Sequence, residues 1–211
     1  MSEFDYLRDP EAIYRASFAA IDQAADWTGV AAAMVPVYRR LVHACGMVDI
    51  LSDLRHGNDV APAARAALVA GAPVIADCEM VAHGIIRRFL PAGNPVLCFL
   101  NHEGVAARAQ QMGTTRSAAA IAQAGEKLEG AVVAIGNAPT ALFALLEMMA
   151  AQGVRPAAIL GFPVGFIGAA ESKQALTVHH QGVGYVTLLG QRGGSALAAA
   201  AVNALAVESM R

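Results

Sequence analysis

Short apolar runs alternate with longer amphipathic segments along most of the chain. Runs of strand length lie at about 73–78, 95–100, 131–136, 157–161 and 184–189. Segments with helical spacing lie between and after them, at about 102–112, 115–128, 139–152, 168–178 and 194–206. Strands that alternate with helices are typical of βαβ units, and near-continuous apolar strands are typical of a parallel sheet buried on both faces. The pattern therefore predicts an α/β fold with an open, doubly wound parallel sheet of about five strands and helices on both faces.

Helices are also expected before the first of these strands. They are predicted from Asp9 onward, at about 30–45 and at about 60–70, with a loop over 51–60. The Asp9-Pro10-Glu11 tripeptide has the order of an N-cap, a first helical position and an acidic first turn. Pro36 either kinks the second helix or marks its true beginning. No linker or repeat divides the chain, so residues 1–211 are predicted to form a single domain.

The composition excludes several classes of protein. Charged residues make up 15% of the chain and hydrophobic residues 56%, which is far from the composition of a disordered protein. No stretch of about 20 apolar residues is present, so no membrane span is expected. The net charge is −2 with no basic face, which argues against nucleic-acid binding. Of the 15 basic residues, 13 are Arg; this bias reflects either codon usage or a ligand rich in carboxylates or phosphates.

The cysteines indicate a reducing compartment. Cys45, Cys78 and Cys98 form no C-x-x-C pair and lie in apolar surroundings, so they are predicted to be small core residues. The stretch 1–9 is acidic and has no apolar core, unlike a signal peptide. A cytoplasmic protein is the simplest interpretation.

Three turns that follow predicted strands have suggestive chemistry. In the 136–140 turn, Gly-Asn-Ala-Pro-Thr, free backbone N–H groups at a helix start are expected to receive an anion. The 161–168 and 190–195 turns are rich in glycine, which either permits close approach of a ligand or only serves the turn. The G-x-G-x-x-G, Walker, G-x-S-x-G and H-E-x-x-H motifs are all missing. The sequence therefore gives no support for NAD, ATP or serine-hydrolase chemistry.

Individual polar residues suggest acid–base or anion-binding roles. His43 and His83 are each either an acid–base group or a structural residue, and no group of histidines has the spacing of a metal site. Asp77 or Glu79 is expected to cap the helix that follows the first predicted strand, or to bind a ligand. Thr115 is the predicted N-cap of a helix whose first turn carries Arg116, and that cation calls for an anionic partner.

Several blocks in the same order resemble the precorrin-8X methylmutase family of cobalamin (vitamin B12) biosynthesis. They run from Asp5 to about Leu205 and include residues 13–18, 42–46, 77–85, 90–94, 115–120, 134–142 and 160–173. The resemblance implies a flavodoxin-like sheet and a homodimer with active sites near the subunit interface. It implies an isomerase that moves a methyl group from C-11 to C-12 of precorrin-8X, giving hydrogenobyrinic acid by a 1,5-sigmatropic shift, without a separate cofactor.

The resemblance also implies roles for particular residues. His43 matches the catalytic histidine and would exchange a proton with the macrocycle. The implied contacts with the carboxylate-rimmed tetrapyrrole are Ser17, Arg39, Arg40, His83, Arg116, Asn137, Ala138, Thr140, Val164 and Gly165. The chain departs from the family pattern at Thr114 and Ile86, which leaves polar contacts at those two positions open.

Three alternatives remain open from the sequence. The block around His83 resembles the metal-free, aerobic branch of the family, but a cobalt-precorrin-8 substrate of the anaerobic route is the first alternative. A corrinoid carrier without catalysis is the second. A flavodoxin-like protein that binds a nucleotide or FMN at the same strand ends is the third.

Overall fold

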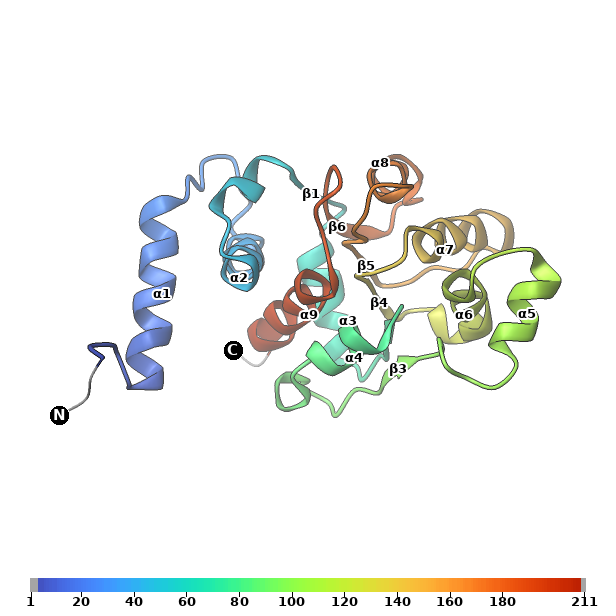
Figure 1. Cartoon of the computed structure of the whole chain (residues 1–211), viewed down its shortest axis with the longest axis horizontal. Helices are drawn as coiled ribbons and strands as arrows, with labels where there is room; N and C mark the ends of the chain where they lie inside the picture. The colour runs from blue at the N-terminus through green and yellow to red at the C-terminus, as the bar shows by residue number, and fades with distance from the viewer. Residues whose placement is uncertain (1–3, 210–211) are drawn as a thin grey trace.

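A mixed six-stranded sheet forms the centre of the computed structural model (Figure 1). Its strands, in the spatial order β1-β6-β5-β4-β2-β3, are β1 (Leu54–Gly57), β6 (Gly184–Leu188), β5 (Ala158–Gly161), β4 (Val132–Ile135), β2 (Val74–Ala76) and β3 (Val96–Cys98). The structure describes residues 4–209, so the first three and last two residues of the predicted domain, and part of the acidic stretch 1–9, lie outside it. The prediction of an α/β fold with five parallel strands is confirmed.

The sixth strand, β1, was expected to be part of a loop. It pairs antiparallel with β6, from Leu54 opposite Leu188 to Gly57 opposite Tyr185. Only Leu54 of this strand is fully buried, and Arg55 is exposed. An edge strand with one neighbour and polar side chains has no apolar run, so its sequence does not resemble the buried strands.

Helices cover both faces of the sheet (Figure 1). They are α1 (Pro10–Ala24), α2 (Val35–Cys45), α3 (Val60–Val69), α4 (Glu79–Gly84), α5 (Val105–Met112), α6 (Arg116–Ala124), α7 (Pro139–Gln152), α8 (Ala169–His179) and α9 (Ser195–Ser209), with 3-10 turns at Val48–Ser52, Arg87–Phe89 and Gly125–Leu128. One face packs against α3, α4 and α9, and the other against α6, α7 and α8. The buried side chains accordingly form two cores, one on each side of the sheet.

The two N-terminal helices form an outer layer. α2 packs on α9, and α1 packs on α2 without burying any residue fully (Figure 1). The predicted helix start at Asp9 is confirmed, because its carboxylate accepts a hydrogen bond from the N–H of Ala12 at 2.8 Å. α2 begins at Val35, so Pro36 marks the beginning of this helix and does not kink it.

The strand order places the topological switch point between β2 and β4. The chain goes from β2 outward to β3, returns to β4 on the other side of β2, and continues through β5 to β6. In doubly wound sheets ligands bind outside the carboxyl ends of the strands near such a point. Within residues 4–209, no helix is long and apolar enough to cross a membrane.

Candidate active site

The outward side of α2 carries the basic residues that the sequence analysis selected. Val37, Tyr38, Leu41 and Val42 are the buried residues of this helix. His43 follows Arg39 by four residues and Arg40 by three, so the imidazole lies one helical turn from both arginines. The helix ends at Gly46 in the left-handed conformation (φ 70°), so His43 lies in its last turn.

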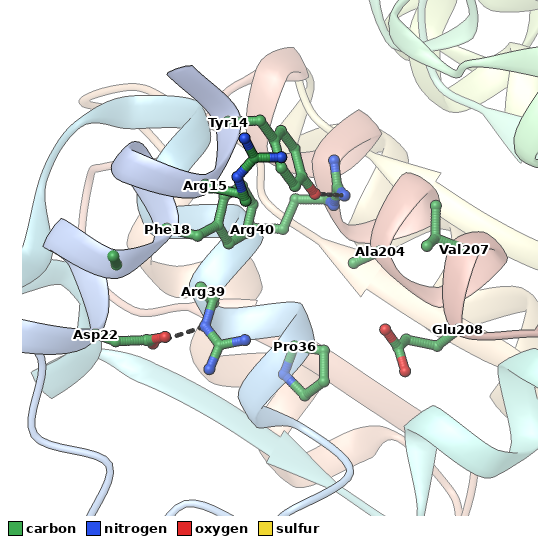
Figure 2. Close-up of a pocket in the computed structure, with 11 residues that line it drawn as sticks. Tyr14, Arg15, Phe18, Asp22, Pro36, Arg39, Arg40, Ala204, Val207 and Glu208 are labelled. Carbon is green, nitrogen blue, oxygen red and sulfur yellow. Dashed lines mark hydrogen bonds and ion pairs between the residues drawn. The ribbon is translucent and has the colours of Figure 1, made fainter. Parts of the chain in front are cut away.

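Three neighbouring pockets surround this side of α2. The first, about 400 Å³, lies between α1, α2 and the end of α9 and is lined by Tyr14, Phe18, Arg39 and Arg40 among others (Figure 2). The second, about 280 Å³, contains Arg40 and His43 together with Gly84 of α4 and the first half of α9. The third, about 260 Å³, places Ser17 beside His43 between α1 and α2. Arg40 and His43 each line two of the three pockets, which makes them the centre of the candidate site.

The two arginines of α2 differ in their partners (Figure 2). The Nε of Arg39 donates to Oδ1 of Asp22 at 2.7 Å, an ion pair between α1 and α2. The Nη2 of Arg40 donates to the Tyr14 hydroxyl at 2.8 Å, and among residues 4–209 no ion pair includes Arg40. Arg39 is therefore partly neutralised, whereas Arg40 keeps its charge for a ligand.

The imidazole of His43 is exposed and stacks on an aromatic ring. Its centroid lies 5.0 Å from that of Phe18 with an interplanar angle of 24°, and 6.3 Å from that of Tyr14. Within the described part of the chain, neither ring nitrogen has a hydrogen-bond partner. Both nitrogens are therefore free to exchange a proton with a bound molecule.

At the switch point, an internal carboxylate occupies the helix start where an external anion was expected. Asp77, 1% exposed at the end of β2, accepts from the backbone N–H groups of Gly136, Asn137 and Ala138 at 2.8–2.9 Å. Burial raises the pKa of the Asp77 carboxyl, and the three hydrogen bonds offset part of that rise. The expectation of free N–H groups in this turn is therefore wrong.

The same contact corrects the predicted cap of the helix after β2. The N-cap of α4 is Cys78, without a side-chain hydrogen bond, so neither Asp77 nor Glu79 caps that helix. Asp77 instead serves the turn that leads into α7, in which Gly136 lies 59 residues further along the chain. A negative side chain at this point disfavours a ligand phosphate, which argues against the nucleotide or FMN alternative.

A second group of predicted residues meets where α6 and α7 begin. Thr115 is the N-cap of α6, as predicted, and its hydroxyl accepts from the N–H of Ala118 at 3.2 Å. The same hydroxyl lies 2.7 Å from that of Thr140 in the first turn of α7. Arg116 is exposed beside them, and no acidic partner for it occurs within residues 4–209. No pocket described above contains both Arg116 and His43.

The loops after β5 and β6 brace each other at the same edge of the sheet. The N–H of Gly165 donates to the carbonyl of Gln191 at 3.2 Å, and that of Gly194 to the carbonyl of Phe162 at 2.8 Å. Val164 is 44% exposed, and the apolar side chains of Phe166 and Ile167 next to it are 84% and 90% exposed. The predicted contact residues Val164 and Gly165 therefore lie in a loop that is hydrogen-bonded to the loop after β6 and exposes the Val164 side chain.

Two residues behind these loops were missed by the sequence analysis. Arg192 donates to Asp49 at 2.6 Å and to Asp53 at 2.8 Å, which ties the loop after β6 to the turn that follows α2. Lys173 of α8 is fully buried and donates to the carbonyl of Arg192. An isolated lysine in a helix gives no signal of burial, because lysine is almost always exposed.

His83, the remaining predicted contact, lies at the end of α4. Its Nδ1 is 2.8 Å from the carbonyl oxygen of Glu79 and 3.8 Å from the carboxylate of the same residue. The imidazole is exposed, and the adjacent Gly84 lines the pocket that contains His43. Among the described residues, no group of three or more histidine, cysteine or acidic side chains is arranged to hold a metal ion.

Fold and site together define an α/β protein with an exposed histidine beside an arginine in the walls of neighbouring pockets. A family model described as precorrin-8X methylmutase matches residues 12–208. The chain is 56% identical over 204 residues to the precorrin-8X methylmutase of Pseudomonas aeruginosa, covering 97% of this chain and 98% of that protein. It is 36% identical over 207 residues to the cobalt-precorrin-8 methylmutase of Salmonella typhimurium, covering 95% and 96% of the two chains.

A solved structure agrees with the sequence comparisons. The crystal structure of precorrin-8X methylmutase from Thermus thermophilus matches with a TM-score of 0.86 and 40% identity, over 94% of this chain and 96% of that chain. The chain belongs to the precorrin-8X methylmutase family. It is thus an isomerase of cobalamin biosynthesis, and the resemblance stated from its sequence blocks is confirmed.

Proposed function

We propose that the chain moves a methyl group from C-11 to C-12 of precorrin-8X to give hydrogenobyrinic acid, with His43 as proton donor and acceptor. The observation that carries this proposal is the position of His43, exposed in the wall of two pockets and next to Arg40. The reaction is a 1,5-sigmatropic shift: the C-11–methyl bond breaks as the C-12–methyl bond forms, and electrons redistribute within the conjugated ring. No nucleophile and no separate cofactor are required.

The proposed role of His43 follows from the balance of this reaction. Substrate and product are isomers, so a proton given to one atom of the macrocycle is balanced by one that leaves another. His43 selects the reactive tautomer of the ring through this exchange, which is typically worth about 10²–10⁴ in rate. Holding the macrocycle rigidly supplies the remaining acceleration.

The arginines of the site are proposed to bind the carboxylates of the substrate. A flat apolar ring edged with carboxylates needs an apolar slot with cationic and N–H groups at its rim. Arg40, Arg39 and Ser17 occupy the rim around His43, and the apolar surface comes from α1 and α9. Arg116, with Asn137, Ala138, Thr140, Val164, Gly165 and His83, remains a proposed set of further contacts.

A homodimer is part of the proposal, with residues 1–211 as a single domain. Arg116 and the loop with Val164 lie outside the pockets of His43, so a second copy is proposed to complete the site at the subunit interface. The metal-free substrate is favoured over cobalt-precorrin-8 by the higher identity to the Pseudomonas aeruginosa relative. The three free cysteines suit the proposed cytoplasmic location.

A single-turnover absorbance experiment with precorrin-8X tests the function. Methyl migration changes the conjugation of the macrocycle, so the visible spectrum is expected to become that of hydrogenobyrinic acid. His43→Ala is expected to slow this change by about 10²–10⁴-fold while ligand binding persists. Recovery of unrearranged substrate from the wild-type protein would support a corrinoid carrier, provided that cobalt-precorrin-8 also fails to react.

A further inference from the structure

An aromatic pair on α1 contacts both central residues of the site. Tyr14 and Phe18 are separated by one helical turn, and their ring centroids lie 4.4 Å apart. Phe18 in turn stacks on His43, and the Tyr14 ring lies 6.3 Å from the imidazole at 53°, so the three rings form a cluster in which Phe18 and His43 are the stacked pair. The pair therefore joins the outer helix directly to the proton-exchanging group.

The stack is what orients the imidazole. The torsion that rotates a histidine ring about its Cβ–Cγ bond is broad, so an exposed imidazole samples many planes unless a neighbour restricts it. No hydrogen bond from the described part of the chain restricts His43. The face of Phe18, 5.0 Å away at 24°, is the contact that restricts the plane of the imidazole and leaves both nitrogens open.

The same aromatic pair holds the arginine (Figure 2). The Tyr14 hydroxyl accepts the hydrogen bond from Arg40 at 2.8 Å, and the Arg40 guanidinium lies 5.8 Å from the centroid of Phe18, within the range of a cation–π contact. α1 has no fully buried residue, and Tyr14 is 47% exposed. Core packing therefore does not explain the placement of the pair, whereas contact with Arg40 and His43 does.

We propose that Phe18 and Tyr14 are positioning residues for the methyl transfer. Phe18 sets the plane of the His43 imidazole, and Tyr14 aims the Arg40 guanidinium at a substrate carboxylate. The proposal rests on the proposed function of His43 and adds two residues that act through others. It assigns Phe18 to the rate of rearrangement and Tyr14 to the affinity for the tetrapyrrole.

Matched variants separate the two roles. Phe18→Leu keeps apolar volume without a ring and is expected to lower the single-turnover rate about tenfold at saturating precorrin-8X, with an unchanged Kd for hydrogenobyrinic acid. Phe18→Tyr retains the ring and is expected to retain the rate. Tyr14→Phe removes only the acceptor of the Arg40 hydrogen bond and is expected to raise Kd about tenfold at an unchanged saturated rate. Ile13→Ala, a truncation on the same helix away from the pockets, is the control and is expected to change neither quantity.

A spectroscopic measurement on the free protein reports the stack itself. Protons over an aromatic face are shifted upfield, so the His43 ring signals are expected to move downfield in Phe18→Leu and to stay in place in Phe18→Tyr. An unchanged rate and unchanged His43 signals in Phe18→Leu would overturn the role of Phe18. Equal loss of rate in Phe18→Leu and Phe18→Tyr would also overturn it, since the ring would then be irrelevant. An unchanged Kd in Tyr14→Phe would overturn the role of Tyr14.

The outcome of His43→Ala distinguishes a failure of the proposed role of His43 from a failure of the positioning role of Phe18. If His43→Ala keeps the wild-type rate, the proposed function of His43 fails. If His43→Ala loses activity while Phe18→Leu does not, only the positioning role fails.

Discussion

The Asp77 carboxylate accepts a hydrogen bond from the backbone N–H of Gly136 at 2.9 Å, across the switch point of the sheet. The next two N–H groups of the same turn also point at this carboxylate. A doubly wound sheet commonly uses such a helix start to hold a ligand anion, whereas here the protein supplies the anion itself. The pockets that define the candidate site lie instead beside the outer helices α1 and α2.

Replacing this carboxylate is predicted to destabilise the fold. Asp77→Asn keeps one acceptor oxygen and replaces the other by an NH2 donor, where three backbone N–H groups need both oxygens, so at least one buried N–H loses its partner. The expected loss is about 2 kcal/mol of unfolding free energy, measured by urea denaturation. Asp59→Asn is the control: Asp59 is exposed and has no side-chain cap bond, so its substitution is expected to cost less than about 0.5 kcal/mol. Equal stability of the two variants would show that the three contacts contribute nothing net.

The fold could be predicted where each segment carries its own periodic pattern. All five parallel strands read as apolar runs, and four of them are fully buried while the edge strand β3 is half-buried. Asp9 and Thr115 mark helix starts through local capping chemistry. β1 could not be predicted, because a polar edge strand is specified by its pairing with β6 and not by its own sequence. α4, with six residues, is too short to show a helical period, so the helix expected after β2 rested on the acidic residues beside its start alone, and its N-cap is Cys78.

The candidate site shows the same division. His43 and Arg40 were selected from the sequence and lie together because they share one helix turn. Asp77 and Gly136 are 59 residues apart in sequence, and only the strand order brings them into contact. The spacing of Tyr14 and Phe18 predicts that the two aromatic rings lie on one side of a helix. Their contacts with Arg40 and His43 could not be predicted, because those contacts depend on how α1 packs on α2.

The two adjacent arginines of α2 are predicted to contribute unequally to ligand binding. Arg39 already forms an ion pair with Asp22, so removing the Arg39 side chain is expected to weaken ligand binding only slightly. Arg40→Ala removes a cation whose only described hydrogen-bond partner is a hydroxyl, and it is expected to raise the Kd for hydrogenobyrinic acid about 10–100-fold. Arg39→Ala is expected to raise Kd less than about threefold. Absorbance titration at fixed salt measures both, and a larger effect of Arg39→Ala would reverse the assignment.

The buried amine of Lys173 is predicted to make stability depend on pH in the alkaline range. Burial lowers the pKa of Lys173 to about 8, because the charged form loses its hydration. In the unfolded chain the amine titrates near its ordinary pKa of 10.5. Between these values the unfolded state binds more protons than the folded state, so unfolding free energy rises with pH. The rise is expected to reach at most roughly 3 kcal/mol and to be absent below about pH 8.

Lys173→Met isolates this contribution. The variant has no amine to titrate, so the difference between wild type and variant is expected to grow in favour of the wild type from about pH 8 to 10. Lys127→Met, which removes the only other lysine of the chain at an exposed position, is the control and is expected to leave the pH profile of the wild type intact. Urea denaturation at several pH values provides the profiles. Because the wild type and Lys173→Met share every other titrating group, a parallel profile in Lys173→Met would mean that the buried amine keeps an ordinary pKa in the folded state.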